Sequence, residues 1–449
     1  MNRTITDFLN NELKEYANDI IKNRCIPSIV DSFKPIQRKI MWVSNNIWKI
    51  GNEKPVKVFS LVGSVSSLAY YHHGDASCSE AICNMNQTFK NNLPMLEGIG
   101  QYGSLRSPFH AQDRYISTKL HPNFRLVYKD FELLENQIDE GVEIEPKWFL
   151  GIIPMIIVNQ SMGIGMGFAS TILGRNPKDV IDNCINHIEG KKVKELKPWL
   201  SEFSGEWVRD ADNKKKWYIH GKYEISNTKP EIHITELPPD MTFEKYEVYL
   251  DSLVDGKILR DYDNNSSSNV DYLLKFRKEE FDKIVGDKEK LEKLLKINDS
   301  VTENLTTIDE NEKLKVFDCV EDMLVYFVDF RMGYYQKRKD YLIGKWTEEL
   351  NEMIMRAKFI KAIISKKLVV NNVPKDEIVS WLDENKFDRM DGSYGYLLNM
   401  PIHSLTKEKY DELLNKTKAK KEQIDEYSRK GTKEMYLEDL YELKRKIKS

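Results

Sequence analysis

The chain has few cysteines and no long apolar run. No two of its five cysteines form a CxxC pair. Scattered thiols in odd number argue against a disulfide framework or a zinc site and fit a reducing compartment. No stretch approaches the ~18 apolar residues of a membrane helix, and the start of the chain is charged, unlike a secretory signal. We therefore expect a cytoplasmic protein that makes no membrane contact. The cysteines are Cys25, Cys78, Cys83, Cys184 and Cys319.

The net charge is small, and its distribution is more informative than its sum. The net charge is -3 at pH 7, which by itself gives no support to binding of nucleic acid. Residues 24–119 hold eleven Lys or Arg against six Asp or Glu, whereas residues 120–160 hold three against seven. A basic segment beside an acidic one can form a local phosphate-binding surface, although such asymmetry is also common on solvated faces.

The first hundred residues predict three helices. Apolar residues recur at helical spacing over residues 6–23, until Pro27. The Lys34-Pro35 turn precedes a second amphipathic stretch, and a third helical segment begins just after residues 72–75. Two helices and a turn leading to a third suit a helix-turn-helix DNA reader, and they suit many other helical domains equally well.

The rest of the chain changes character twice. Alternating Tyr, Ile and Thr within residues 205–285 predict β-strands, for example at 217–225, whereas the charged residues 285–315 predict a solvated helix or linker. Beyond them, apolar residues step by three or four over 342–364 in a heavily charged segment, which is typical of a coiled coil. A second charged helical stretch covers 406–429. The two stretches predict an antiparallel hairpin that carries a small globule.

Five segments, read in order, resemble the DNA cleavage subunit of type IIA topoisomerases. Any one of them can arise by chance, but chance is a poor explanation of their shared order over nearly the whole chain. The Tyr-His-His-Gly sequence is closer to the eukaryotic form than to gyrase, and the short chain is similar to the bacteriophage form. The segments are IPSIVDSFKPIQRKIMW, VKVFSLVGSVSSLAYYHHGDASCSEAI, GIGQYGSLRSPFHAQDRYISTKL, MGIGMGFAST and YGYLLNMPIHSLTKE.

The resemblance implies an α+β multidomain protein. It places a winged-helix (helix-turn-helix) DNA-binding domain with the nucleophilic tyrosine in residues 1–170, and a mixed α/β tower domain in residues 171–315. It also implies a long antiparallel coiled-coil arm in residues 316–449. A small helical globule, at about 366–405, is expected to join two copies of the chain.

Tyr115 is the nucleophile that the resemblance implies. A tyrosine hydroxyl is protonated at neutral pH and is a poor nucleophile unless it is activated. Arg114 precedes it, and a guanidinium favours the phenolate and binds phosphate. In the family, the tyrosine takes the 5′ end of the broken strand. Without the matching context RYIST, Tyr115 would be one of 22 tyrosines and would more commonly be a packed side chain.

Three further positions match residues near the scissile phosphate. His73 resembles the residue that hydrogen-bonds this phosphate, and Arg38 is implied to join Arg114 and His73 around it. His72 is the weaker candidate and is assigned to DNA binding. On sequence alone, a His pair before Gly-Asp is more often a turn or a helix cap, and Arg38 has even odds of lying on a solvated helix face.

Four residues are implied to contact or deform DNA elsewhere. Lys34, Lys39 and Lys57 are expected to touch the phosphate backbone, which supplies affinity and register but little sequence reading. Ile164 lies in Met-Gly-Ile-Gly-Met-Gly, and in the family an isoleucine here wedges between base pairs and bends the duplex. The apolar stretch around it predicts short buried strands and tight turns, in which a buried Ile164 is the alternative.

The resemblance assigns the metal and the nucleotide to another chain. Phosphoryl transfer generally needs a divalent ion, so Mg²⁺ and ATP are expected on a partner subunit with ATPase and toprim domains. The pairs Asp210/Asp212 and Asp261/Asp263 match no metal site of the family and are assigned to solvent, so no metal ligand is predicted here. The other partners are double-stranded DNA and a second copy of the chain.

The predicted function is the DNA-binding and cleavage/religation subunit of an ATP-dependent type IIA topoisomerase. Such an isomerase passes one duplex through a transient double-strand break in another and reseals the break. The alternative is a non-catalytic, DNA-bending architectural protein with the same basic surface and coiled coil. The two differ in whether Tyr115 forms a covalent bond to DNA.

Overall fold

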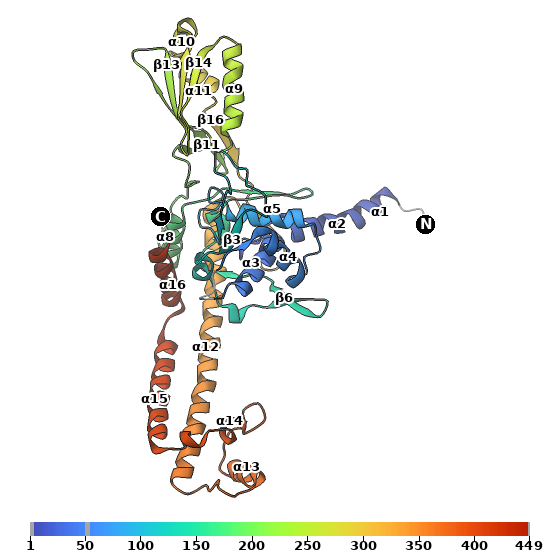
Figure 1. Ribbon diagram of the computed structural model, residues 1–449, viewed down its shortest axis with the longest axis vertical. Helices are drawn as coiled ribbons and strands as arrows, with labels where there is room; N and C mark the ends of the chain where they lie inside the picture. The colour runs from blue at the N-terminus through green and yellow to red at the C-terminus, as the bar shows by residue number, and fades with distance from the viewer. Residues whose placement is uncertain (1–3, 50–53, 448–449) are drawn as a thin grey trace. The chain divides into compact units, whose positions relative to one another are not determined.

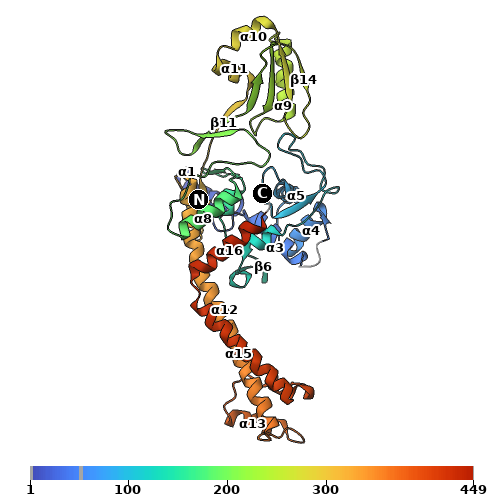
Figure 2. The same cartoon turned by 90° about the vertical axis from the view of Figure 1, so that its left-hand side faces the viewer.

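The computed structural model describes residues 4–49 and 54–447, which divide into two compact units. The first unit contains the described residues up to Arg331 and from Leu437 onward, and the second is Met332–Tyr436. Figures 1 and 2 show the elements of each unit. Among the described residues, no helix is both long enough and apolar enough to cross a bilayer.

The N-terminal part of the first unit consists of helices around a small antiparallel sheet. Pro35 begins α3, where the N–H that it lacks would have no helical partner, and the Gln37 side chain accepts a hydrogen bond from the Lys34 N–H at 2.9 Å. Helices α3, α4 and α5 pack against one another (Figure 1). The elements are α1 (Ile5–Asn10), α2 (Glu12–Ile20), η1 (Ile21–Cys25), α3 (Pro35–Ile47), α4 (Val58–Leu68) and α5 (Asp75–Asn86), with sheet order β1 (Val56–Lys57), β3 (Ser117–Leu120), β2 (Leu96–Ile99).

Short strands and helices follow, up to residue 188. Three two-stranded antiparallel sheets form from β4 with β7, β5 with β6, and β8 with β9. Phe124, Tyr128 and Phe149 are buried, and their ring centroids are 5.0 to 5.9 Å apart. The elements are α6 (Asn123–Val127), β4 (Tyr128–Lys129), η2 (Phe131–Leu133), β5 (Asn136–Asp139), β6 (Val142–Pro146), β7 (Leu150–Gly151), α7 (Met155–Val158), β8 (Ser161–Ile164), β9 (Ala169–Ile172) and α8 (Pro177–Ile188).

The middle of the chain is β-rich, which confirms the prediction from alternation. The run 217–225 forms two strands of different sheets, because the chain changes sheet at Gly221, where a Cβ would lie 2.4 Å from the Glu236 carbonyl oxygen. One sheet has the order β10 (Glu206–Arg209), β11 (Lys216–His220), β16 (Asn298–Thr302). The other is β12 (Lys222–Ile225), β13 (Glu231–Glu236), β15 (Tyr272–Phe276), β14 (Leu259–Asn264), and the helices are α9 (Phe243–Asp255), α10 (Lys278–Ile284) and α11 (Lys288–Leu295).

Residues 285–315 are more structured than the predicted solvated helix or linker. Helix α11 buries Leu291 and Leu295, and β16 forms the edge of a sheet. The polar sequence of β16 concealed the strand because most of its side chains are exposed. Beyond it, β17 (Thr306–Ile308) pairs with β18 (Leu314–Val316).

The second unit contains two paired helices and a small globule. Helix α12 (Val320–Ile364) begins in the first unit and continues through the second. Trp346 packs edge-on against Tyr427 at 5.0 Å, and Glu349 pairs with Lys420 at 2.6 Å, so α12 and α15 run antiparallel. The globule buries an apolar cluster next to the end of α12. The other helices of the second unit are α13 (Lys375–Glu384), α14 (Gly395–Leu398) and η3 (Ile402–Ser404), and α15 spans Lys407–Arg429. Helix α16 (Thr432–Lys446) begins in the second unit and ends in the first.

Candidate functional site

Tyr115 has a fixed backbone and an exposed ring. It ends the loop that joins β2 to β3, and its side chain is 70% exposed. Its N–H donates to the Gln112 carbonyl oxygen at 2.9 Å, and its own carbonyl oxygen accepts from the Lys57 Nζ at 2.9 Å. Arg114 is also exposed. The structure therefore exposes two consecutive side chains, a guanidinium and a phenol, on an anchored turn.

The loop that carries Tyr115 is attached to helix α5. Ser79 of α5 donates to the Asp113 carboxylate at 3.2 Å, and the Glu80 carboxylate lies 3.0 Å from the His110 Nε2. The hydrogen bond from His110 lowers the pKa of Glu80. Burial lowers the pKa of His110, but its hydrogen bonds to the Ala111 carbonyl oxygen and to Glu80 outweigh burial and raise it.

A groove of about 1700 Å³ runs along the same helix. Its walls include the start of α3, the first turns of α5 and the β8–β9 hairpin. Lys22 and Arg24, at the C-terminal end of the helix predicted over residues 6–23, also line the groove and were not among the predicted site residues. Two cations at a helix end were the available signal. The cations and histidines in its lining are Lys22, Arg24, Lys34, Arg38, Lys39, His72, His73, Lys90 and Lys147.

The two predicted histidines are exposed at the groove. His72 Nε2 lies 3.6 Å from the Asp139 carboxylate, and the His73 ring packs edge-on against Tyr71 with centroids 5.3 Å apart. Both precede α5, the helix that also holds the Tyr115 loop. The structure thus brings the histidines and the tyrosine loop to one helix, with the histidines in the groove lining and Tyr115 outside it.

Arg38 has an internal acidic partner. Its side chain is almost fully buried, and its Nε donates to the Asp31 carboxylate at 2.6 Å while one Nη donates to the other Asp31 oxygen at 3.1 Å. Asp31 also accepts from the backbone N–H of Phe149 at 3.2 Å. This ion pair occupies the Nε and one Nη of the guanidinium, while Arg38 still lines the same groove as His73.

Lys34 and Lys39 also have internal partners, in contrast to the expected contacts with a DNA backbone. Lys34 Nζ donates to the Met162 carbonyl oxygen at 2.7 Å, and burial lowers its pKa. Lys39 Nζ donates to the Ala69 carbonyl oxygen at 2.6 Å and pairs with Glu145 at 3.0 Å. Both ammonium groups therefore hold chain segments around the groove in this structure.

Ile164 stands at the end of a tight hairpin. Strands β8 and β9 pair in register, and the Gly165 N–H donates to the Phe168 carbonyl oxygen at 2.8 Å. A Cβ at Gly163 would lie 2.0 Å from the Cys25 carbonyl oxygen, so only glycine fits there. Ile164 is 78% exposed. The structure has the predicted short strands and tight turn, but β8 is only partly buried, and the Ile164 side chain is exposed rather than packed in a core.

The described residues offer no obvious metal centre. Within residues 4–49 and 54–447, no three His, Cys, Asp or Glu side chains gather in a metal-binding arrangement. Two of the aspartates assigned to solvent have protein partners. Asp210 accepts from the Tyr218 hydroxyl at 2.8 Å, and Asp263 pairs with Lys275 at 2.7 Å.

Comparison with known proteins gives a consistent answer over the whole chain. Residues 24–443 match the A-subunit family of DNA gyrase/topoisomerase IV. The chain is 32% identical to the DNA topoisomerase medium subunit of Enterobacteria phage T4, with 99% of each chain covered. It is also 32% identical to DNA topoisomerase 2 of Plasmodium falciparum (isolate K1 / Thailand), where 98% of this chain covers 34% of the longer protein.

A solved structure gives the same result for the fold. The crystal structure of the Plasmodium falciparum topoisomerase II DNA-binding, cleavage and re-ligation domain has a TM-score of 0.85 at 31% identity, over 98% of this chain and 64% of that one. The predicted mixed α+β fold is confirmed.

The matches define the class, type II DNA topoisomerases. Within it, the chain belongs to the A-subunit family of DNA gyrase/topoisomerase IV. This membership does not favour the architectural alternative. The chain spans about a third of the length of the eukaryotic relatives.

Proposed function

We propose that this chain binds, cleaves and rejoins DNA as one subunit of an ATP-dependent type IIA topoisomerase. The Tyr115 oxygen would attack a backbone phosphorus and form a 5′-phosphotyrosine bond, while the 3′ oxygen of the neighbouring sugar leaves and takes a proton. The new diester keeps the energy of the broken linkage, so resealing is the reverse step. The observation that carries the proposal is an exposed phenol, on a loop anchored at both ends, in a chain of this family.

The neighbouring side chains have two proposed roles: some would contact the phosphate, and others would position the residues of the site. Arg114 is exposed beside the phenol and would neutralise charge on the attacked phosphate, and His73 would donate to the same phosphate. Arg38 would act through Asp31 as a positioning residue, since its Nε and one Nη already donate to that carboxylate. Lys57 would position the Tyr115 backbone. His72 would stay a secondary DNA contact at the groove.

The β8–β9 hairpin supports a role in DNA bending. An exposed Ile164 on a hairpin of small residues has the shape of an apolar wedge that unstacks one base step. Lys34 would fix the base of this wedge through Met162 rather than bind phosphate itself. Lys39 would similarly hold the wall that contains Glu145.

We assign three parts to the enzyme. A winged-helix domain would occupy residues 1–170, a tower domain 171–315 and a coiled-coil arm 316–449. Two copies, joined by the globule at about 366–405, would supply one tyrosine to each strand of a duplex. The antiparallel pairing of α12 with α15 supports the arm, and three helices next to a three-stranded sheet support the winged helix.

The proposal places Mg²⁺ and ATP on a partner subunit. The described acidic residues form no metal-binding cluster, so the divalent ion that stabilises the phosphate charge would be held by the toprim domain of that partner. A full-length match to the phage T4 medium subunit supports such a division between chains.

Relaxation of a supercoiled plasmid tests the proposed function. The full chain, its ATPase/toprim partner, Mg²⁺ and ATP should relax the plasmid, and Tyr115→Phe should abolish relaxation while leaving DNA binding within about twofold, because a phenyl ring has the same bulk. Relaxation by Tyr115→Phe at the wild-type rate would contradict the proposal.

A further inference from the structure

Two arginine–glutamate pairs of the first unit are almost completely buried. Arg175 and Glu303 have side chains 0% and 1% exposed, and Arg106 and Glu236 have side chains 4% and 7% exposed. Burying charge is costly, and such a pair is often no more stable than an apolar replacement of equal volume. Their position is therefore more informative than their energy. Each pair joins a different segment of the candidate site to the β-rich residues 205–308.

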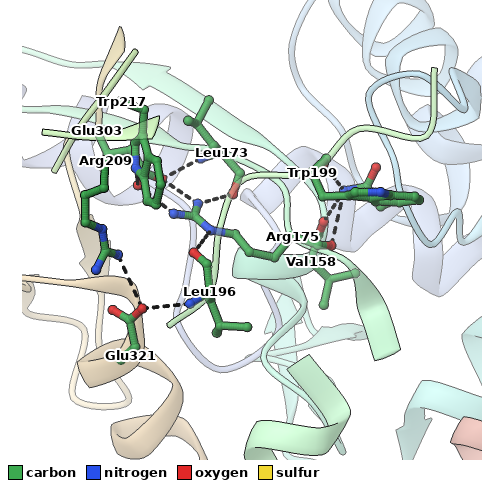
Figure 3. A network of polar contacts seen from close by, with 10 residues as sticks. Val158, Leu173, Arg175, Leu196, Trp199, Arg209, Trp217, Glu303 and Glu321 are labelled. Atoms are coloured by element: carbon green, nitrogen blue, oxygen red, sulfur yellow. Dashed lines mark hydrogen bonds and ion pairs between the residues drawn. The ribbon is translucent and has the colours of Figure 1, made fainter. Parts of the chain in front are cut away.

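The Arg175–Glu303 pair is bidentate and fully hydrogen-bonded. The two Arg175 Nη atoms donate to the two Glu303 oxygens at 2.6 and 2.7 Å, and the Trp217 indole N–H adds a third bond to Glu303 at 3.0 Å (Figure 3). Arg175 also donates to the carbonyl oxygens of Leu173 and Leu196. A planar guanidinium held in this way has one orientation.

Glu303 is directly connected to the hairpin that carries Ile164. Its carboxylate accepts from the backbone N–H of Leu173, the residue that follows β9, at 2.9 Å. The next residue, Asn304, exchanges two backbone hydrogen bonds of 2.9 Å with Thr171 of β9. A change at the Glu303 carboxylate would thus move the base of the hairpin.

The same carboxylate is connected to β11 and to the start of α12. Trp217 lies on β11, and the Arg209 guanidinium stands over its ring at 4.7 Å. Arg209 bonds to Glu321 of α12, which also accepts from the Leu196 N–H at 2.9 Å (Figure 3). The network therefore spans the hairpin, a strand of the β-rich region and the first turn of α12.

The second pair holds the loop that leads to Tyr115. Arg106 lies in this loop, and one of its Nη atoms donates to Glu236 of β13 at 2.6 Å, while the other donates to the Pro238 carbonyl oxygen at 2.6 Å. The Ser204 N–H and hydroxyl donate to the other Glu236 oxygen, each at 2.8 Å. Arg106 is thereby fixed to the sheet that follows β11 in the chain.

We propose that the two pairs are separate positioning devices for one reaction. Glu303, through Arg175, sets the angle at which the Ile164 wedge meets DNA and so governs bending. Glu236, through Arg106, sets the position of the Tyr115 loop and so governs attack. The proposal rests on the proposed roles of Ile164 and Tyr115. None of the four charged side chains touches DNA in this account.

The test uses Glu303→Gln and Glu236→Gln as controls for each other, because each removes the charge of one buried glutamate. Each full chain is combined with its ATPase/toprim partner, Mg²⁺ and a duplex labelled at both ends. Energy transfer between the labels reports bending, and the yield of protein-linked DNA after denaturation reports attack. Both are repeated on a duplex with a mismatch at the wedge step, which lowers the cost of bending.

Glu303→Gln should reduce bending and lower the adduct yield about tenfold on the intact duplex, and the mismatch should restore the yield to within about twofold. Glu236→Gln should bend DNA as the wild type does and lose adduct on both duplexes. A merely structural defect would not be relieved by the mismatch. Normal bending by Glu303→Gln, or equal rescue of both variants, would overturn the proposal.

If Glu303→Gln does not fold, Trp217→Phe tests the bending role of Glu303 in its place. Trp217→Phe keeps an aromatic ring and removes the indole N–H that donates to Glu303. Its adduct yield on the intact duplex should therefore fall by less than that of Glu303→Gln, and the mismatch should restore it. A yield that does not depend on the mismatch would refute the role of Glu303 in bending. Absence of an adduct with the wild-type chain would instead contradict the proposed function itself. The two failures are therefore distinguishable.

Discussion

The ammonium group of Lys57 donates a 2.9 Å hydrogen bond to the carbonyl oxygen of Tyr115. Lys57 belongs to β1, whose partner in the sheet is β3, the strand that begins two residues after Tyr115. A cation predicted to bind the DNA backbone thus bonds to the backbone of the candidate nucleophile. The contact positions the Tyr115 backbone just before the chain enters β3, and the phenol remains exposed.

Lys57→Met distinguishes a lysine that binds the DNA backbone from one that positions the backbone of Tyr115. Loss of the bond to Tyr115 should lower the rate of adduct formation by about tenfold, with DNA affinity nearly unchanged, since a charged hydrogen bond contributes about 1.5–3 kcal/mol. Binding measured at several salt concentrations and single-turnover cleavage check this. A uniform loss of affinity with a salt slope smaller by about one unit would instead identify a phosphate contact.

Removing one partner of the Asp31–Arg38 pair should strongly destabilise the first unit. Asp31→Asn leaves a buried guanidinium without its counter-charge and should lower the free energy of unfolding by about 3–5 kcal/mol. Denaturant unfolding followed by tryptophan fluorescence measures the loss. Glu280→Gln, which breaks the exposed pair with Lys283, is the control and should change stability by no more than about 0.5 kcal/mol. Equal effects would show that Arg38 is not tied as described.

The His110–Glu80 pair should make stability depend on pH. The raised histidine pKa adds stability below its ordinary value of 6.5, and this is lost as the pH rises through the folded pKa. The lowered glutamate pKa adds stability above 4.5, and this is lost as the pH falls through the folded value. Glu80→Gln should therefore cost most between these values, on the order of 0.5 kcal/mol because both groups are partly exposed.

Thermal unfolding of the wild type and Glu80→Gln across this pH range tests the pair. Glu97→Gln, which removes an acid paired with Lys119 and no histidine, is the matched control and should show no change through the histidine titration. A deficit of Glu80→Gln that persists unchanged at alkaline pH would contradict a charged histidine in the folded chain.

Gly163→Ala should displace the wedge hairpin. The new methyl group would lie 2.0 Å from the Cys25 carbonyl oxygen, so the hairpin must move away from the turn that ends at Cys25, at a cost of about 1–3 kcal/mol, and DNA bending should fall. Gly344→Ala in α12 has open space around the added carbon and should stabilise the helix by about 0.5–1 kcal/mol. Unchanged melting temperature and bending in Gly163→Ala would show that the close approach to Cys25 does not position the hairpin.

Local signals were sufficient for several elements. Pro35 after Lys34 marked the start of α3, the helical segment predicted just after residues 72–75 overlaps α5 (Asp75–Asn86), and apolar spacing over 406–429 predicted α15 at Lys407–Arg429. The helix predicted over 6–23 is instead divided near Asn11 and ends in a π-helical turn. Helix α4 was not predicted, because its exposed face carries serine and glycine in place of the charged side chains that usually mark the solvated face of a helix.

The candidate site was harder to predict than the fold because its charges depend on distant partners. Arg38 and Lys34 look like free cations in the sequence, yet each has a partner within the chain, Asp31 for Arg38 and the Met162 carbonyl oxygen for Lys34. The Arg175–Glu303 pair joins residues 128 positions apart in the sequence, so no local sequence pattern predicts it. Tyr115 could be selected among the tyrosines because its context matched a family, not because of any property of its own segment.

The most direct measurement is covalent capture of DNA by the full chain in complex with its ATPase/toprim partner and Mg²⁺. After rapid denaturation, the wild type and Tyr16→Phe, which alters another exposed tyrosine, should retain DNA linked through its 5′ end, and the tyrosine-bearing peptide should contain Tyr115. Tyr115→Phe should retain none. An adduct of equal yield from Tyr115→Phe, or one mapped to another residue, would contradict the account.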